Sequence, residues 1–218
     1  KKIAEHMVLT KRVSPHVSTI HQVDVTQVAR LRETGKQTFF ERSGVKLTFL
    51  PFFLRATASA LKEFPTVNAS LDGEQVIFHL DVNVGVAVAL KDGLLVPVIR
   101  NVDRKNVAAL QGELVDLAER ARGKRLKPEE VHQGTFSISN YGSFGSLLAT
   151  PAINQPQAAI LGLGAIHKAP VVIDDAIAIR SICYVTLSFD HRLLDGAVGD
   201  QFVSHLKRII ENWSEELF

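Results

Sequence analysis

Four ionisable side chains lie within six positions in the stretch LSFDHRLLDG: Asp190, His191, Arg192 and Asp195. They follow an apolar run, Ile177 to Leu187, that is typical of a strand entering a packed core. Charges are costly to place beside a core, so the cluster indicates either a structural ion-pair network or a catalytic site. A histidine with an unperturbed pKa of ~6.5 is suited to taking a proton from a thiol or hydroxyl near neutral pH.

A second candidate is Ser139, near the end of the strand-like FSISN and ahead of the glycine- and serine-rich loop YGSFGS. Loops of this kind often carry function. Ser139 could be a nucleophile activated by His191, which is hydrolase chemistry, or a donor to an oxyanion, which is direct acyl transfer. The absence of a G-x-S-x-G motif around Ser139 disfavours an α/β-hydrolase. A third interpretation is that Ser137 and Ser139 simply finish a strand.

Other motifs carry less chemistry. Gly162-Leu163-Gly164 resembles half of a dinucleotide fingerprint, but the third glycine is missing, so nucleotide binding is disfavoured. The eight histidines show no zinc-motif spacing, and we expect no metal. The single cysteine, Cys183, excludes an intrachain disulfide and lies in an apolar run, which favours core packing over nucleophilic catalysis.

Helices and strands alternate around these candidates without a repeat or a long linker. We expect helices over residues 26–43, 48–64 and 106–122 and a final helix through 198–213. We expect strands over residues 16–25, 67–69, 76–78, 82–90, 94–100, 136–140, 158–164 and on both sides of Asp174-Asp175. This mixture predicts one α/β domain with a mixed sheet over residues 1–218.

Composition excludes several classes of function. The chain has 218 residues, of which 46% are hydrophobic and 22% charged, and 25 Lys and Arg face 23 Asp and Glu. No basic block supports a nucleic-acid partner. No apolar run approaches the ~20 residues that a membrane span needs, and no signal peptide opens the chain. The start KKIAEHMVLT lacks an initiator Met and begins as though inside a helix, so we expect an excised domain from a reducing compartment.

Four stretches carry a resemblance that single motifs do not. They are the opening IAEHMVLTKRVSPHVSTIHQVDVT, then VGVAVALKDGLLVPVIRN, then FSISNYGSFGSLLATPAINQPQAAILGLG, and finally DHRLLDG with its preceding strand. Together, and in this order, they resemble the catalytic domain of dihydrolipoamide acyltransferases, the core subunits of 2-oxo acid dehydrogenase complexes. Chloramphenicol acetyltransferase shares the His-x-x-x-Asp-Gly pattern but not the wider similarity.

The resemblance implies a two-layer α/β sandwich with a mixed sheet, like that of chloramphenicol acetyltransferase. It implies acyl transfer between the thiol of dihydrolipoyl-lysine and the thiol of coenzyme A, with both groups as substrates. By the same resemblance His191 is the general base, Ser139 stabilises the tetrahedral oxyanion and Asp195 supports the site.

The resemblance also suggests where coenzyme A binds and which acyl group is moved. By position in the matching segments, Lys91, Asp92 and Gly93 form a wall of the thiol channel, and Asn140 lies beside it. The loop SNYGSFGS is slightly nearer to succinyl-transferring relatives than to acetyl- or branched-chain-transferring ones. Three alternatives stay open: a serine hydrolase, a chloramphenicol acetyltransferase-like acyl-coenzyme A transferase, and an inactive assembly scaffold.

Relatives of this family assemble, and the resemblance extends to partners. It implies a homotrimer in which His191 and Ser139 come from neighbouring subunits, and a cubic or icosahedral core of such trimers. It implies decarboxylase and dihydrolipoamide dehydrogenase components as partners, in the bacterial cytoplasm or the mitochondrial matrix. Lipoyl and subunit-binding domains are absent from this chain. The apolar end, Trp213 to Phe218, is predicted to be a docking tail.

Overall fold

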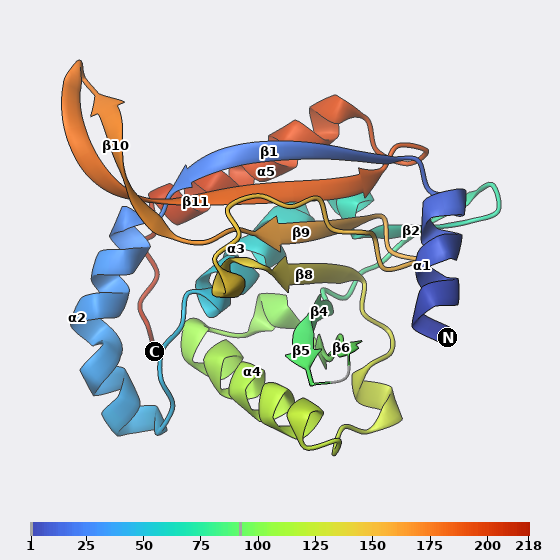
Figure 1. Cartoon of the computed structure of the whole chain (residues 1–218), viewed down its shortest axis with the longest axis horizontal. Coiled ribbons are helices and arrows are strands. Elements are labelled where there is room, and N and C mark those ends of the chain that lie inside the picture. Colours follow the sequence, from blue (N-terminus) through green and yellow to red (C-terminus); the bar gives the residue numbers. More distant parts are fainter. Residues whose placement is uncertain (1, 92) are drawn as a thin grey trace.

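A mixed sheet forms the centre of the computed structural model, which describes residues 2–91 and 93–218 (Figure 1). The strands of its main path, in spatial order, are β1 (His16–Asp24), β11 (Ala176–Asp190), β9 (Ala159–Leu163), β8 (Phe136–Asn140), β4 (Val84–Val86) and β7 (Val98–Ile99). A seventh strand, β10 (His167–Ile173), pairs with β11 off this path. β8 runs parallel to β9 and β4, whereas the other pairs are antiparallel. The predicted mixed sheet is therefore confirmed.

In the described part of the chain, five α-helices surround the sheet. They are α1 (Lys2–Val13), α2 (Thr26–Ser43), α3 (Leu50–Glu63), α4 (Val107–Arg122) and α5 (Gly196–Glu211). α3 and α5 pack against each other and form the second layer behind the sheet in the view of Figure 1. Phe202 of α5 lies 6.0 Å, centroid to centroid, from the ring of Phe136 in β8, and both side chains are fully buried. Burying such aromatic rings stabilises the two layers against each other. None of the described helices is long and apolar enough to cross a membrane.

Short elements correct three sequence predictions. The strand expected over 67–69 is wrong, because Pro65–Asn68 forms a 3-10 helix and β2 (Ala69–Asp72) begins only afterwards, pairing with β3 (Gln75–Phe78). The strands expected over 82–90 and 94–100 are each two strands, because β5 (Val88–Leu90) and β6 (Gly93–Leu95) leave β4 and β7 to form a separate hairpin. Pro97, between β6 and β7, lacks an N–H and so cannot donate to a ladder there. Further 3-10 turns are Val102–Arg104, Pro128–Glu130 and Gly142–Phe144.

The face of the sheet away from α3 and α5 is crossed by residues 147–157, which we call the strap (Figure 1). Side chains from α1, β1 and β8 hold it. Thr10 donates to the carbonyl of Ile153 at 2.8 Å, and the N–H of Ile153 donates to Nε2 of His16 at 3.0 Å. At the other end, the Ser137 hydroxyl donates to Oε1 of Gln157 at 2.6 Å. Every one of these contacts satisfies a polar group that the strap buries or half-buries.

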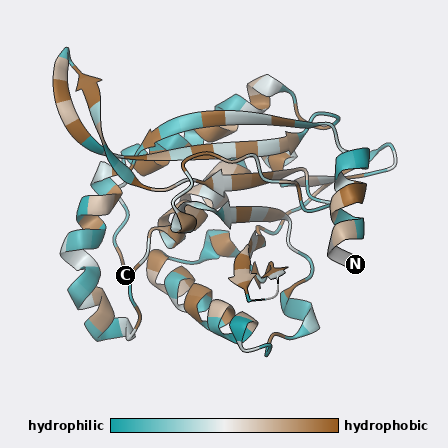
Figure 2. Cartoon of the chain, viewed as in Figure 1, coloured by the Kyte–Doolittle hydropathy of each residue, from teal (hydrophilic) through white to brown (hydrophobic). Residues whose placement is uncertain are grey.

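One hairpin leaves the body of the molecule. β10 and the first residues of β11, which we call the arm (residues 167–181), project beyond the rest of the sheet (Figure 1). Hydrophobic residues line it (Figure 2), and Val172, Ile177 and Ile179 are among the most exposed apolar side chains. Ile177 is opposite Val172 in the ladder, so the two side chains share one face. An apolar face of this kind is typical of a surface that binds another protein.

Candidate active site

Ser139 is the next-to-last residue of β8 and lies at a cavity of about 760 Å³. β8 is buried up to Ile138, and its alternation places Phe136 and Ile138 in the core and Ser137 and Ser139 on the opposite, strap-covered face. Asn140, a predicted coenzyme A-binding residue, also lines the cavity. Its Oδ1 accepts a hydrogen bond from the N–H of Ser143 at 3.3 Å, which shapes the loop that follows.

The cavity is bounded largely by apolar side chains of α3, α4 and β4. Leu114, Leu117 and Val86 are among those that line it. Polar groups stand elsewhere on its wall, where Gln111 accepts two hydrogen bonds from Thr48 and is therefore already satisfied. A channel with apolar walls and a few placed polar groups is the usual form of a small-molecule site.

His191 follows β11 by one residue, at the end of the sheet where β8 begins (Figure 1). Its backbone N–H donates to the carbonyl of Pro15 at 2.9 Å, and its exposed ring lies 6.0 Å from the ring of Phe189. Ser139 is level with Thr186 in the sheet register, two strands away and five residues before His191. Strand geometry then separates the two residues by roughly 15 to 20 Å. Within one chain, Ser139 and His191 do not meet.

A buried ion pair supports the turn that carries His191. Asp190 is only 3% exposed, and Arg192 donates to both of its carboxylate oxygens, at 3.0 Å from Nε to Oδ1 and 2.6 Å from Nη2 to Oδ2. The Ser14 hydroxyl donates to the same Oδ2 at 2.6 Å. Burial raises the pKa of Asp190, but the hydrogen bonds from Arg192 and Ser14 outweigh it and hold that pKa below its ordinary value. Asp190 and Arg192 thus form an ion pair within the charged cluster.

Asp195 is the N-cap residue of α5. Its Oδ1 accepts a hydrogen bond at 2.8 Å from the N–H of Val198, so it caps the start of α5. The first amide groups of a helix need such an acceptor, and aspartate is among the best. Asp195 therefore fixes the start of α5, four residues after His191.

The predicted coenzyme A wall falls at the turn between β5 and β6. Asp92 lies outside the described residues. Lys91 and Gly93 are exposed at the turn between β5 and β6, and the residues of this hairpin that line the cavity are instead Val88, Ala89 and Leu94. The hairpin thus borders the cavity through its apolar side chains.

Sequence patterns did not predict the surroundings of Cys183 and His16. Cys183 lines the cavity, yet burial raises the pKa of its thiol to about 12, so it stays protonated at neutral pH and is no nucleophile. His16 donates through Nδ1 to the carbonyl of Ser14 at 2.8 Å and accepts at Nε2 from the N–H of Ile153, so its ring has a structural role. No pattern in the sequence reveals the contact of His16 with Ile153, because the two residues are distant along the chain. Over residues 2–91 and 93–218, no group of three or more His, Cys, Asp or Glu side chains is placed to hold a metal ion.

Comparison with known structures first defines the fold class. Chloramphenicol acetyltransferase, at 14% identity and a TM-score of 0.56, covers 95% of this chain and 92% of its own and shares the fold. The predicted two-layer sandwich of this type is confirmed. A model of the family described as 2-oxoacid dehydrogenases acyltransferase (catalytic domain) matches residues 1–218. The chain belongs to this family.

Relatives with higher identity cover nearly the whole chain. A lipoamide acyltransferase component of the branched-chain alpha-keto acid dehydrogenase complex from Bacillus subtilis is 42% identical over 99% of this chain and 51% of its own length. A dihydrolipoyllysine-residue succinyltransferase component of the 2-oxoglutarate dehydrogenase complex from Rickettsia typhi is 41% identical over 97% and 53%. This chain therefore spans about half the length of the curated relatives it matches.

Solved structures agree with this assignment. A probable dihydrolipoamide acetyltransferase from Listeria monocytogenes is 40% identical with a TM-score of 0.97, over 100% of this chain and 94% of that one. The structure of the cubic core of a pyruvate dehydrogenase multienzyme complex is 37% identical with a TM-score of 0.94, over 97% and 87%.

Proposed function

We propose that this chain is the catalytic core of an acyltransferase that moves an acyl group between dihydrolipoyl-lysine and coenzyme A in a 2-oxo acid dehydrogenase complex. The match of the family model to residues 1–218 supports the reaction class. The observation that carries the mechanism is the placement of Ser139 at the cavity and of His191 on an outward turn at the other end of β8.

Each residue has one step in the proposed reaction. The His191 imidazole takes the proton of the coenzyme A thiol, whose pKa of ~8.5 leaves it mostly protonated at pH 7. The thiolate attacks the carbonyl carbon of the acyl-dihydrolipoyl thioester. The carbonyl oxygen becomes an oxyanion, to which the Ser139 hydroxyl donates a hydrogen bond. When the intermediate collapses, the carbon–sulfur bond to the lipoyl group breaks, and that sulfur takes the proton back from His191.

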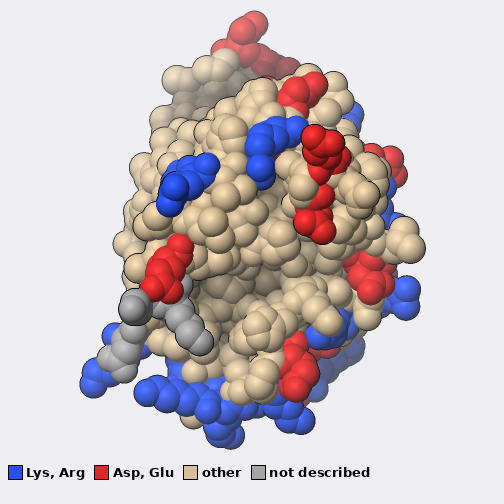
Figure 3. Space-filling view, turned by 90° about the vertical axis from the view of Figure 1, so that its right-hand side faces the viewer, with Lys and Arg blue, Asp and Glu red and all other residues tan. Residues whose placement is uncertain are grey.

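This mechanism requires two copies of the chain. Proton transfer by His191 and oxyanion stabilisation by Ser139 require both side chains to reach the same reacting thioester. Within one chain the two residues are roughly 15 to 20 Å apart, which is too far. We therefore place His191 of one subunit against the cavity of the next in a trimer. The face at the His191 end is uncharged over much of its centre, with basic side chains along its lower edge in Figure 3. A surface depleted of charge at its centre is suited to a subunit interface.

Assembly beyond the trimer is part of the proposal. The similar solved structure is a cubic core, and the exposed apolar residues Val172, Ile177 and Ile179 of the arm need a partner surface. We propose decarboxylase and dihydrolipoamide dehydrogenase components as partners of the assembled core. The bacterial relatives favour the cytoplasm as its compartment.

For the acyl group we place succinyl first, and the support is the loop SNYGSFGS alone. Identity does not rank the candidates, because the branched-chain relative and the succinyl relative are 42% and 41% identical. Steady-state transfer from succinyl-, acetyl- and isobutyryl-coenzyme A to free dihydrolipoamide tests this ranking. A higher kcat/KM for succinyl supports it, and a higher value for either other donor overturns it.

Mixed trimers test the two-subunit site. Chains with His191→Ala and chains with Ser139→Ala, carrying different affinity tags, are co-expressed, and trimers that hold both tags are purified. In a cyclic trimer either mixed composition contains one interface with an intact Ser139 and an intact His191, so activity should return to about one third of wild type. Trimers of either variant alone are the matched controls.

The opposite result is equally clear. If both residues act from one chain, no mixed trimer contains an intact pair, and the mixture stays as inactive as its parents. If neither parent variant has lost activity, His191 and Ser139 are not the catalytic residues, and the proposed mechanism is wrong.

A further inference from the structure

Ser139 lies where β8 pairs with a neighbouring strand on one side only. β4 pairs with β8 only as far as Ile138, whose carbonyl accepts from the N–H of Ala87 at 3.0 Å. Beyond that point the ladder continues on the β9 side, where Ser139 is opposite Gly162. A strand end that pairs on one side only needs further contacts if its side chain is to hold a fixed position.

The ring of Tyr141 lies over Gly162. A Cβ atom added to Gly162 would stand 2.7 Å from Cε1 of Tyr141 and 3.0 Å from its hydroxyl oxygen. Residues opposite each other in a ladder share a face, so the ring lies on the same face of the sheet as the Ser139 side chain. Glycine at position 162 is what allows this close approach.

The Tyr141 hydroxyl is tied to two further segments. It lies 3.2 Å from the Thr186 hydroxyl and donates to the carbonyl of Ala149 in the strap at 3.3 Å. Thr186 is fully buried and is opposite Gly162 on the side away from Ser139. Tyr141 thus extends from the end of β8 across Gly162 to Thr186, and it connects β9 and β11 to the strap.

The loop after Tyr141 has no room to shift on β9. A Cβ at Gly142 would lie 2.3 Å from the carbonyl of Gly164, and one at Gly164 would lie 2.1 Å from the carbonyl of Leu147. The N–H of Ala165 also donates to the carbonyl of Ser146 at 2.9 Å. If the Tyr141 side chain moved, the end of β8 that carries Ser139 would therefore have to move with it.

We propose that Tyr141 is a positioning residue for Ser139, holding its hydroxyl at the cavity through the ring over Gly162 and the hydroxyl contact with Thr186. The proposal rests on the proposed function, in which the Ser139 hydroxyl meets an oxyanion that exists only during the reaction. Loss of the contact should therefore lower kcat and leave the KM for acyl-coenzyme A unchanged.

The test combines four variants in the assembled enzyme. Tyr141→Phe keeps the ring and removes the hydroxyl, and Thr186→Val removes its partner at nearly constant shape. Each should lower kcat about fivefold at constant KM, and the double variant should lose no more than either alone, because the two hydroxyls act as one contact. Tyr184→Phe, which removes the hydroxyl of the only other tyrosine in the chain, is the matched control and should keep wild-type kcat.

The Ser139→Ala background separates positioning from a merely structural role. If Tyr141 acts through Ser139, Tyr141→Phe should change the kcat of Ser139→Ala by less than about twofold. An unchanged kcat in Tyr141→Phe, or an equal loss with and without Ser139, overturns the proposal while the proposed function stands. Wild-type kcat in Ser139→Ala itself overturns the role of Ser139, and with it both proposals.

Discussion

The two candidate catalytic regions are built in opposite ways. Ser139 lies on a strand, beside a cavity, among contacts that its own chain supplies from β9 and the adjoining loop. His191 lies on a turn with an exposed ring, and what its own chain supplies is the backing of that turn by Asp190 and Arg192. A region can therefore be rigid without containing all the groups that the reaction needs. Each region is held firmly, yet neither holds the other's catalytic group.

The largest effect should come from the exposed region. His191→Ala should lower kcat about 10³-fold, because it removes the proposed general base, whereas Ser139→Ala should cost about 10²-fold as the loss of one oxyanion donor. Steady-state kinetics with each acyl-coenzyme A and dihydrolipoamide measure both. His132→Ala, another exposed histidine, is the matched control and should keep wild-type activity. A smaller loss for His191→Ala than for Ser139→Ala would reverse the assignment of roles.

Removing the Asp190–Arg192 ion pair behind the His191 turn should mainly lower the stability of the fold. Arg192→Met leaves the buried Asp190 carboxylate without its cation, at a cost of about 3 kcal/mol in the free energy of unfolding at pH 7. In the wild type the pKa of Asp190 is lowered, so its contribution is present above the ordinary value of 3.8 and is lost as the pH falls below it. Without Arg192, burial raises that pKa, and the carboxyl becomes neutral at a higher pH.

The difference between Arg192→Met and wild type should therefore shrink as the pH falls from 7 toward 4. Chemical denaturation at several pH values measures it. Arg30→Met on the exposed surface of α2 is the control and should show no such trend. A difference that is constant with pH would mean that Asp190 and Arg192 do not stabilise each other.

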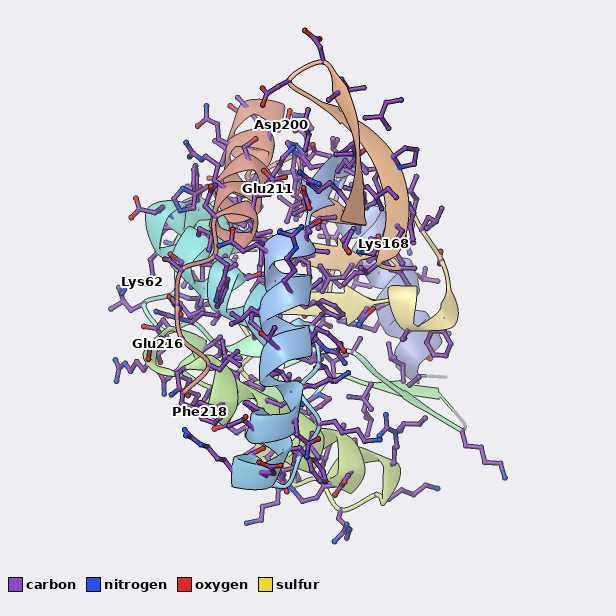
Figure 4. The ribbon with its side chains drawn as sticks, turned by 90° about the vertical axis from the view of Figure 1, so that its left-hand side faces the viewer. Lys62, Lys168, Asp200, Glu211, Glu216 and Phe218 are labelled. Carbon is purple, nitrogen blue, oxygen red and sulfur yellow. The ribbon has the colours of Figure 1, made fainter. Side chains whose placement is uncertain are left out.

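The C-terminal tail has a docking place on its own chain. Leu217 is 8% exposed and lies against Gly35 of α2, and the ring of Phe218 stacks on Phe39 at 5.4 Å (Figure 4). Deleting Glu216 to Phe218 should lower the free energy of unfolding by about 2 kcal/mol, chiefly through the loss of buried Leu217. It should also leave smaller particles in ultracentrifugation. An unchanged mass would show that these three residues do not contribute to assembly, and Glu216→Gln is the matched control.

Sequence patterns predicted the parts of this fold that depend on local order. The helix over 106–122 is nearly α4, and the turn at Asp174-Asp175 does join β10 to β11. Predictions failed where several partners suit the same residues. Asp195 bonds the start of its own helix, and the valine-rich segment 82–90 splits because its second half pairs with β6 rather than continuing beside β8.

The candidate site shows the same limit. The types of Ser139 and His191 indicate their chemistry, and their register in the sheet then shows that one chain keeps them apart. Periodicity cannot reveal the contact of Tyr141 with Thr186 or of Ser137 with Gln157, because those partners meet only when the strap crosses the sheet. The strap itself has no regular repeat to predict.

The smallest effect should come from the neighbour of Ser139 on the same face of β8. Ser137 is buried, and its hydroxyl donates to Oε1 of Gln157 at 2.6 Å. Ser137→Ala should lower the free energy of unfolding by about 1 kcal/mol, because Gln157 loses one of its partners. The kcat should not change, since Gln157 keeps its bond to the carbonyl of Gly134 at 2.9 Å and that end of the strap stays in place. Thermal denaturation and kinetics beside Ser139→Ala separate the two serines: a loss of kcat in Ser137→Ala without further destabilisation would extend the catalytic region along the strand.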